Sequence, residues 1–364
     1  MINIKNKGDE ISSLIRKDYM KIFEDENIPK YILGINKYSE VLHSFLISKK
    51  IILSGFIDDY TNKKVHSDVK IYKMEEVKNK DSVVFSCVVD GKPITARNKL
   101  TMNGFYRIID YYQLLVTFPF ELKMIDFCSE NQKDIIKNID KYKWVHNNLY
   151  DSLSKETLDL LLDFRYNFDL SVMKSFKIKL EMQYFEDFIK VSRNEIFVDG
   201  GGFDGGTTKK FIDLCPDYKE IYFFEPNPSM LEKAKSDLIN YKNIKYYKKG
   251  LWNENKKLNF DDSLGSASKI SNVGNKLINV VKLDDVLDSP TTFIKLDIEG
   301  AEYNAIKGAE KTITKYKPKL AICVYHNQSD FWRIPLLIKQ YRSDYKIFLR
   351  HYTEGIYETV MYFI

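Results

Sequence analysis

The first half of the chain shows short apolar runs separated by polar stretches. Runs over 30–34, 51–57, 69–72 and 82–89 end at glycine or at polar residues, which predicts four strands. Between the first two runs, apolar residues of 38–47 recur at helical spacing. A strand, a helix and a strand within about 30 residues form a βαβ unit. The pattern therefore predicts a small parallel sheet over 28–125.

A second series of apolar runs begins near residue 195. Runs over 195–198, 220–224, 244–247, 293–296 and 320–325 predict strands, and the segments that start at 207 and at 228 have the pattern of helices. The last segment alternates over 345–351 and 356–363 around a turn that contains Gly355, which predicts a hairpin. We expect an α/β protein with a doubly wound sheet that ends in this antiparallel hairpin, preceded by a smaller Rossmann-like domain.

These patterns divide the chain into four consecutive segments. We expect an N-terminal helical segment at 1–27, the small Rossmann-like domain at 28–125, a helical connector at 126–192, and the large α/β domain at 193–364. A length of 364 residues agrees with roughly two domains.

Composition narrows the classes of function. The chain has 56 Lys and Arg residues and 51 Asp and Glu residues. Because these charges are interspersed and nearly balanced, we expect no nucleic-acid partner. No apolar run reaches the ~18 residues of a membrane span, and the N-terminus lacks the apolar core of a signal peptide. We therefore expect a cytoplasmic protein. The four cysteines form no CxxC pair, which predicts buried free thiols and no cysteine metal site.

A glycine-rich loop is the strongest chemical signal. Asp199, Gly201, Phe203 and Gly205 alternate between a strand and a helix, where glycines let a ligand approach the backbone and the helix N-terminus favours anions. The next strand ends in Glu225, 20 residues after Gly205, where a carboxylate can accept the ribose hydroxyls of an adenosine. A structural turn without a ligand is the alternative.

Three carboxylates follow the predicted strand at 293–296. Asp297, Glu299 and Glu302 lie within six residues, at the strand end expected beside the glycine loop. Carboxylates so placed can bind a cation or orient a hydroxyl. We interpret Glu299 and Glu302 as residues that flank the helix beginning near Gly300, and we expect Asp297 at the ligand.

These residues resemble the FkbM family of S-adenosylmethionine-dependent methyltransferases. The resemblance covers about 183–364 and follows the family's order. The segments that carry it are 183–185, 198–207, 224–228, 249–252, 282–285, 294–302, 324–326, 349–352 and 358–360. It implies a class I methyltransferase sheet with its terminal hairpin and S-adenosylmethionine as the cofactor.

The resemblance also implies a cofactor site. Asp199, Gly201 and Gly205 would shape the pocket at the methionine end, Glu225 would hold the ribose, and Leu251 and Trp252 would lie near the adenine. The full set of cofactor-binding candidates is Gln183, Tyr184, Asp199, Gly200, Gly201, Gly205, Thr207, Glu225, Pro226, Leu251, Trp252 and Asp297.

Transfer of a methyl group to a hydroxyl needs positioning and benefits from a base. Asp297, His326 and His351 are the candidates for this catalytic role, since His326 follows a buried strand and a neutral imidazole suits a base near pH 7. Hydrogen-bonded structural histidines are the alternative, more so for His351. Assistance by a divalent metal held by Asp297, Glu299 and His326 is a further alternative that spacing alone does not establish.

The N-terminal block resembles the small Rossmann-like domain that precedes sugar acyltransferases of the sialic-acid and bacillosamine type. Residues 31–39 and 55–59 carry this resemblance, which implies binding of the nucleotide of a nucleotide-sugar. The full glycine fingerprint is absent, because Ile35 and Asn36 follow Gly34. An inert scaffold is the alternative.

Together these observations predict a bacterial-type, S-adenosylmethionine-dependent O-methyltransferase. Its substrate would be a hydroxyl of a sugar, a nucleotide-sugar or another glycan precursor, as in the modification of surface polysaccharides. One alternative is an NAD(P)-dependent oxidoreductase or epimerase of nucleotide-sugars that uses the loop at 199–205. The other is a non-catalytic nucleotide-sugar binding module. The sequence leaves the oligomeric state open.

Overall fold

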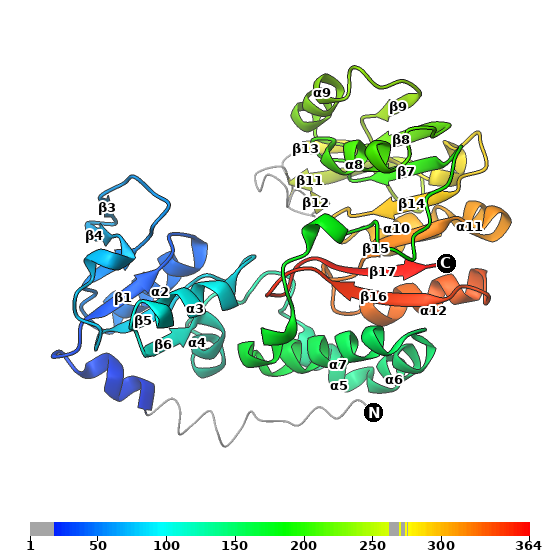
Figure 1. The fold of residues 1–364 in the computed structure, drawn as a ribbon. Coiled ribbons are helices and arrows are strands. Elements are labelled where there is room, and N and C mark those ends of the chain that lie inside the picture. The colour runs from blue at the N-terminus through cyan, green and yellow to red at the C-terminus, as the bar shows by residue number, and fades with distance from the viewer. Residues whose placement is uncertain (1–17, 262–268, 271–273, 275) are drawn as a thin grey trace. The chain divides into compact units, whose positions relative to one another are not determined.

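The computed structural model describes residues 18–261, 269–270, 274 and 276–364 (Figure 1). The chain divides into two compact units that interleave along the sequence. Unit 1 contains 1–136, 158–179 and 352–357, and unit 2 contains 137–157, 180–351 and 358–364. The four consecutive segments stay a prediction about which parts of the chain fold independently. Within the expected helical segment at 1–27, residues 18–24 are helical and 1–17 lie outside the described residues.

Unit 1 contains a six-stranded sheet in the order β3-β4-β2-β1-β5-β6. All neighbouring pairs are parallel except β3–β4. Its strands are β1 (Lys30–Leu33), β2 (Gly55–Ile57), β3 (Val65–His66), β4 (Val69–Tyr72), β5 (Val83–Ser86) and β6 (Arg107–Asp110). Its helices are α2 (Lys37–Ser48), α3 (Pro93–Met102) and α4 (Tyr111–Thr117). The small parallel sheet expected over 28–125 is therefore present.

The predicted strand at 51–57 is shorter than expected. Only Gly55–Ile57 pair with β1, while the amide of Ile51 donates to the carbonyl of Leu46 at the end of α2. Strand β6 lies in an aromatic-rich stretch for which the pattern predicted no strand, because its four residues are too few to show a period.

The segment 352–357 belongs to unit 1 although it lies near the C-terminus. The amide and hydroxyl of Thr95, in the first turn of α3, donate to the carboxylate of Glu354 at 2.7 and 2.6 Å. The buried guanidinium of Arg165 donates to the carbonyl of Ile356 at 3.0 Å. These contacts integrate a C-terminal turn into the core of an N-terminal unit, which apolar spacing does not predict.

Three α-helices and two 3₁₀ turns follow the sheet of unit 1 in the sequence. The segment 126–192, expected to be mostly helical, contains α5 (Asn131–Lys137), α6 (Ile139–Asn148) and α7 (Ser152–Asn167), with 3₁₀ turns at Leu170–Ser175 and Leu180–Met182. Its residues are divided between the two units, and a connector role stays a prediction. Further 3₁₀ turns lie at Met74–Glu76 and Leu283–Asp285. In the described part of the chain, no helix is both long and apolar enough to cross a bilayer.

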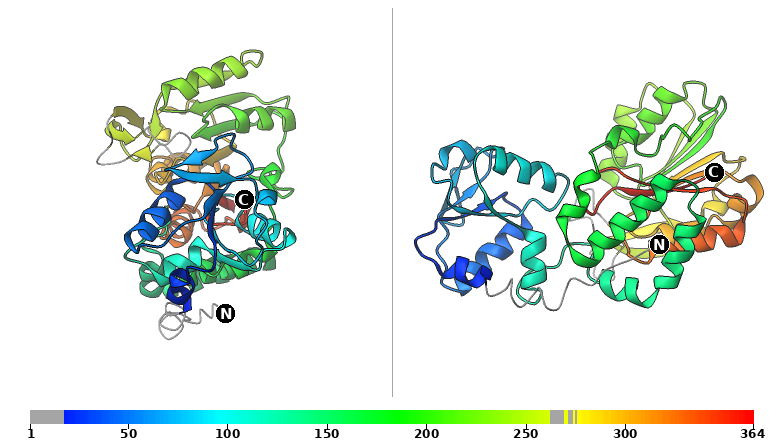
Figure 2. Two further views of the ribbon diagram at one scale, coloured as in Figure 1. Left: turned by 90° about the vertical axis from the view of Figure 1, so that its left-hand side faces the viewer. Right: turned by 60° about the horizontal axis from the view of Figure 1, so that its bottom comes forward.

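Unit 2 contains a seven-stranded sheet in the order β16-β17-β15-β14-β7-β8-β9. The strands are β7 (Ile196–Gly200), β8 (Glu220–Phe224), β9 (Ile244–Tyr247), β14 (Phe293–Leu296), β15 (Lys319–Cys323), β16 (Ile347–His351) and β17 (Thr359–Phe363). The five strands from β9 to β15 are parallel, and β17 is antiparallel to both neighbours (Figure 2). This is the doubly wound sheet with a terminal antiparallel hairpin that the sequence predicts.

Helices cover both faces of this sheet. They are α8 (Gly206–Leu214), α9 (Pro228–Asp237), α10 (Glu302–Lys307), α11 (Glu310–Tyr316) and α12 (Asp330–Tyr341). From β7 the chain adds β8 and β9 on one side of the sheet, and from β14 it adds β15 on the other side. Because such crossovers are right-handed, α8 and α9 lie on one face and α10 to α12 on the other. The order therefore reverses between β7 and β14, where open α/β sheets bind their ligands.

A second, four-stranded sheet lies between β9 and β14 in the sequence. Its order is β10-β13-β11-β12, with β10 (Gly250–Leu251), β11 (Lys256–Asp261), β12 (Lys269–Ile270) and β13 (Lys276–Val281). The sequence pattern did not predict these strands, because most positions of β11 and β13 are exposed or half-buried and Lys or Asn interrupts the apolar residues. All four cysteines are buried and free, as expected.

Candidate active site

The glycine loop joins β7 to α8 and requires glycine at two positions. Gly201 has φ +74° and Gly205, the N-cap of α8, has φ +89°, in the left-handed region that side chains rarely adopt. A Cβ at Gly201 would lie 1.8 Å from the carbonyl oxygen of Asp297. The loop therefore packs backbone to backbone against the end of β14, and it does so at the point where the strand order reverses.

Asp199 lies beneath this loop and is fully buried. Its Oδ1 lies 3.0 Å from Nζ of Lys295 on β14, and its Oδ2 accepts from the hydroxyl of Thr208 at 2.7 Å. Lys295 also donates to the carbonyl of Gly201 at 2.7 Å. Burial lowers the pKa of Lys295, but the charges of Asp199 and Asp297 outweigh burial and raise it, so the ammonium stays charged. Asp199 thus fixes the loop, with both carboxylate oxygens in use, and its role at a cofactor stays a prediction.

Glu225 lies at the carboxyl end of β8. Its Oε2 accepts from the amide of Phe203 at 3.0 Å and its Oε1 from the amide of Asn227 at 2.8 Å. Burial raises its pKa, and the two amides partly offset this effect. The carboxylate joins the glycine loop to the start of α9, and each oxygen retains a lone pair for a hydroxyl donor.

Other predicted cofactor residues lie around the same loop. Gly200 ends β7, and a Cβ there would approach Cδ1 of Leu251 to 3.0 Å, so Leu251 packs directly against the loop. Thr207 lies in the first turn of α8, Pro226 follows Glu225, and Trp252 follows β10. The structure brings Leu251 beside the loop, and the cofactor roles of these residues stay predictions.

Tyr184 contacts Asp297 although it lies 113 residues earlier in the chain, and Gln183 contacts Tyr184. The hydroxyl of the buried Tyr184 donates to Oδ2 of Asp297 at 2.7 Å. Gln183 donates to the Tyr184 hydroxyl at 3.0 Å and to the carboxylate of Glu358. Burial and the charge of Asp297 raise the pKa of Glu358 to about 7. Glu358 was not among the predicted site residues, although 358–360 is one of the segments that carry the family resemblance.

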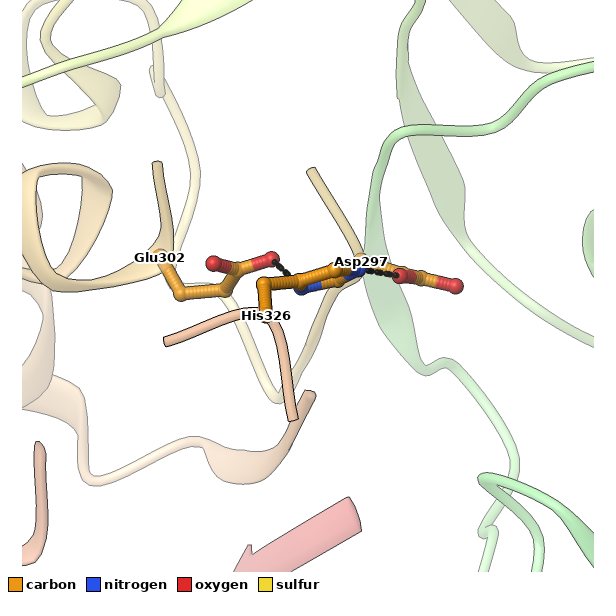
Figure 3. A group of neighbouring side chains, drawn as sticks. All are labelled: Asp297, Glu302 and His326. Carbon is orange, nitrogen blue, oxygen red and sulfur yellow. Dashed lines mark ion pairs between the residues drawn. The ribbon is translucent and has the colours of Figure 1, made fainter. Parts of the chain in front are cut away.

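His326 lies among three carboxylates at the carboxyl end of β15. Its Nε2 lies 3.6 Å from Oδ1 of Asp297 and 3.4 Å from Oε2 of Glu299, and its Nδ1 lies 2.9 Å from Oε1 of Glu302 (Figure 3). The side chains of His326 and Glu302 are 0% exposed, while those of Asp297 and Glu299 are 23% and 17% exposed. One ring nitrogen therefore faces the accessible side of the site and the other faces the interior.

Charge in this cluster is shared between the ring and the carboxylates. Burial alone lowers the pKa of His326, but Glu302 and Glu299 outweigh it and raise the pKa well above its ordinary value of 6.5. Burial raises the pKa of Glu299, whereas for Asp297 the charges of Lys295 and His326 outweigh burial and lower it. The arrangement can hold a proton on the imidazole and an anionic Asp297 next to it.

The predicted alternative of a metal site has one geometric basis among the described residues. Asp297, Glu302 and His326 each offer a ligand atom within 4.8 Å of the others. Figure 3 shows the imidazole between the two carboxylates, so that each ring nitrogen already faces one of them. This geometry suits ion pairs bridged by protons, and divalent-metal assistance stays a prediction that chelation tests.

His351 has a different environment. It lies at the end of β16, where its Nδ1 is 2.9 Å from the hydroxyl of Thr359, its cross-strand partner on β17. This hydrogen bond between strands matches the structural interpretation of His351, and its catalytic role stays a prediction.

At the carboxyl edge of the sheet in unit 1, polar side chains form hydrogen bonds with the backbone of the same unit. Oδ1 of Asn36 caps α2 by accepting from the amides of Tyr38 and Ser39, and its Nδ2 donates to the carbonyl of Cys87. Asp58 accepts from two amides of its own loop, and Asp59 accepts from the amide of Met74. These contacts are caps and turns of the fold itself, and nucleotide binding by the front block stays a prediction beside the scaffold alternative.

Comparison with known proteins defines the class of this site. Residues 199–351 match the family model described as the methyltransferase FkbM domain. This stretch contains the glycine loop, Glu225, Asp297 and His326, and its similarity to the FkbM methyltransferase domain agrees with the resemblance seen in the sequence.

Among solved structures, the chain is similar to methyltransferase FkbM from Methylobacillus flagellatus KT. The two are 24% identical over 96% of this chain and 93% of that one, with a TM-score of 0.76, which shows a common fold. An rRNA methylase from Streptococcus thermophilus is 18% identical over 47% of this chain and 87% of its own, with a TM-score of 0.31. Aeropyrum pernix fibrillarin, solved with bound S-adenosyl-L-methionine, is 11% identical over 53% and 76%, with a TM-score of 0.31. No curated protein matches the chain.

Proposed function

We propose that this protein transfers the methyl group of S-adenosylmethionine to a hydroxyl of a sugar or a sugar-derived glycan precursor. The observation that carries the proposal is the meeting of the glycine loop, Glu225, Asp297 and His326 at the carboxyl ends of β7, β8, β14 and β15. The match to the FkbM methyltransferase domain supports methyl transfer. Support for a sugar hydroxyl comes from the resemblance of the front block to nucleotide-sugar acyltransferases.

The residues present fit the cofactor by their chemistry. Glu225 offers carboxylate oxygens to ribose hydroxyls, and the loop at 199–205 allows close approach to the backbone. When bound, S-adenosylmethionine supplies an electrophilic methyl group on a sulfonium.

The chain's own residues account for the proton. As the C–O bond to the acceptor forms and the C–S bond breaks, the hydroxyl proton passes to Nε2 of His326, which faces Asp297 on the accessible side. Asp297, held by Tyr184, orients the hydroxyl and balances the imidazolium. The products are S-adenosylhomocysteine, a methyl ether and a proton that the imidazole later releases to water.

A binding comparison and an acceptor panel test the proposal. We expect calorimetry to show binding of S-adenosylmethionine and of S-adenosylhomocysteine, but not of NAD. We expect S-adenosylhomocysteine release with sugars or nucleotide-sugars, and none with phenols or amines of similar size. A preference for nucleotide-sugars over the free sugars would support nucleotide binding by the front block. Binding of NAD without S-adenosylmethionine would support the oxidoreductase alternative instead.

Substitution of Glu225 by alanine is expected to weaken S-adenosylmethionine binding. Loss of charge-assisted hydrogen bonds costs about 2–4 kcal/mol, or roughly 30- to 1000-fold in Kd. Glu232→Ala is the matched control, because Glu232 is an exposed acid on α9 that pairs with its helix neighbour Lys235. Unchanged affinity in a folded Glu225→Ala protein would exclude Glu225 as the ribose acceptor.

A further inference from the structure

We propose that Glu302 is the positioning carboxylate of this site: it keeps a proton on Nδ1 of His326 and leaves Nε2 as the nitrogen that meets the acceptor. The inference rests on the proposed function in that His326 takes the acceptor proton. It also assigns Glu302 a role that its sequence position, at the start of a helix, does not suggest.

The geometry depends on the turn between β14 and α10. Glu299 has φ +54° and Gly300 has φ +96°, both left-handed, so the chain reverses within two residues. A Cβ at Gly300 would lie 3.1 Å from Nδ2 of Asn327, which leaves little room for another residue there. Because of this reversal, Asp297, Glu299 and Glu302 all reach the ring of His326 although they come from one short stretch. Figure 3 shows Asp297 and Glu302 on either side of the ring.

Glu302 is anchored more firmly than a residue that only flanks a helix. Its Oε1 accepts from the amide of Ile298 at 2.9 Å and lies 2.9 Å from Nδ1 of His326. Both side chains are fully buried. By contrast, Glu310 is also the first residue of a helix, α11, and it is exposed. A helix start alone therefore does not explain why Glu302 is buried against an imidazole.

Burial makes the orientation of the ring consequential. A buried carboxylate is stabilised by pairing or hydrogen bonds, and here Oε1 of Glu302 accepts from the amide of Ile298 and lies 2.9 Å from Nδ1 of His326. A neutral imidazole has one N–H, and the partner of that N–H decides which nitrogen keeps its lone pair. With Glu302 as the partner of Nδ1, the lone pair lies on Nε2, which faces Asp297 and Glu299.

The central test is Glu302→Gln in the full-length protein. The amide keeps the size of the side chain and an oxygen for the amide of Ile298, but it lacks the charge. We expect kcat to fall by about 10- to 100-fold, as for other orienting groups around a functional histidine. We expect KM for S-adenosylmethionine to stay within about twofold, since Glu302 lies away from the glycine loop's contacts. Glu310→Gln is the matched control and should leave both constants unchanged.

Two further measurements separate positioning from mere stabilisation. Because Glu302 raises the pKa of His326, its removal should move the rise of kcat with pH to lower pH. In the background of His326→Ala, Glu302→Gln should cost nothing more, because the two residues act as a unit. Glu302→Asp, which keeps the charge, should retain more activity than the glutamine variant.

Nitrogen NMR of the imidazole tests the inference without an acceptor. At a pH above the imidazole pKa, the wild-type His326 signal, assigned by its loss in His326→Ala, should show the proton on Nδ1. A proton on Nε2 would overturn the inference, as would an unchanged kcat and pH profile in Glu302→Gln. If no acceptor supports methyl transfer, the proposed function fails, and the NMR result still decides the role of Glu302.

Discussion

Replacement of His326 by alanine is expected to lower kcat by about 10²–10⁴-fold, the usual effect of losing a general base. The affinity for S-adenosylmethionine should stay near that of the wild type, because the ring pairs with Asp297, Glu299 and Glu302, whereas Glu225 is the predicted ribose ligand. Single-turnover kinetics and calorimetry measure the two quantities separately.

His351→Ala is the matched control for this substitution. His351 is also a buried histidine at a strand end of the same sheet, but its ring pairs with Thr359. We expect little change in kcat and some loss of stability, because a hydrogen bond between two strands is removed. If His326→Ala keeps more than about a third of the wild-type kcat, positioning alone carries the reaction and the assignment of a base is wrong.

The pH dependence follows from the same cluster. The pKa of His326 is raised above 6.5, and kcat should rise as pH passes the raised pKa, because the ring acts as a base only after it loses its proton. The protonated ring stabilises the fold below pH 6.5, and this contribution is lost as pH rises through the raised pKa. Loss of activity with a chelator and its recovery with a divalent ion would instead support the predicted metal alternative.

The sequence predicts the frame of this site because the frame depends on local patterns. Strand ends carry Glu225 and Asp297, and a doubly wound sheet places such ends at one edge. The glycine loop follows from residues whose backbone conformations only glycine adopts readily. These features need only the order and type of the elements, which apolar periodicity gives.

The remainder depends on contacts that periodicity does not encode. Tyr184 meets Asp297 across 113 residues, and Glu358 joins through Gln183. Glu302 was interpreted as a helix-flanking residue, and it does accept from the amide of Ile298, but the turn at Glu299 and Gly300 also points it at His326. The backbone angles of one turn thus decided whether a carboxylate faces solvent or the site.

The substitution Lys295→Met is expected to destabilise unit 2 by about 3–5 kcal/mol, because it leaves the charge of Asp199 buried without its partner. The Asp199–Lys295 pair is almost fully buried, with side chains 0% and 2% exposed. Differential scanning calorimetry measures the loss. Lys245→Met is the matched control on the same sheet, since Lys245 pairs with Glu220 and Asp288 at the surface, where a salt bridge contributes about 1 kcal/mol or less.

A second substitution shows whether the cost comes from an unpaired charge or from lost packing. The second substitution, Asp199→Asn, is added to Lys295→Met. It keeps an oxygen for the hydroxyl of Thr208 and removes the charge, so the double variant should regain most of the stability that Lys295→Met removes. It should not restore affinity for S-adenosylmethionine, because Nζ of Lys295 also holds the carbonyl of Gly201 and with it the shape of the loop. Recovery of both properties would mean that the pair only balances charge; recovery of neither would mean that packing around Lys295 dominates.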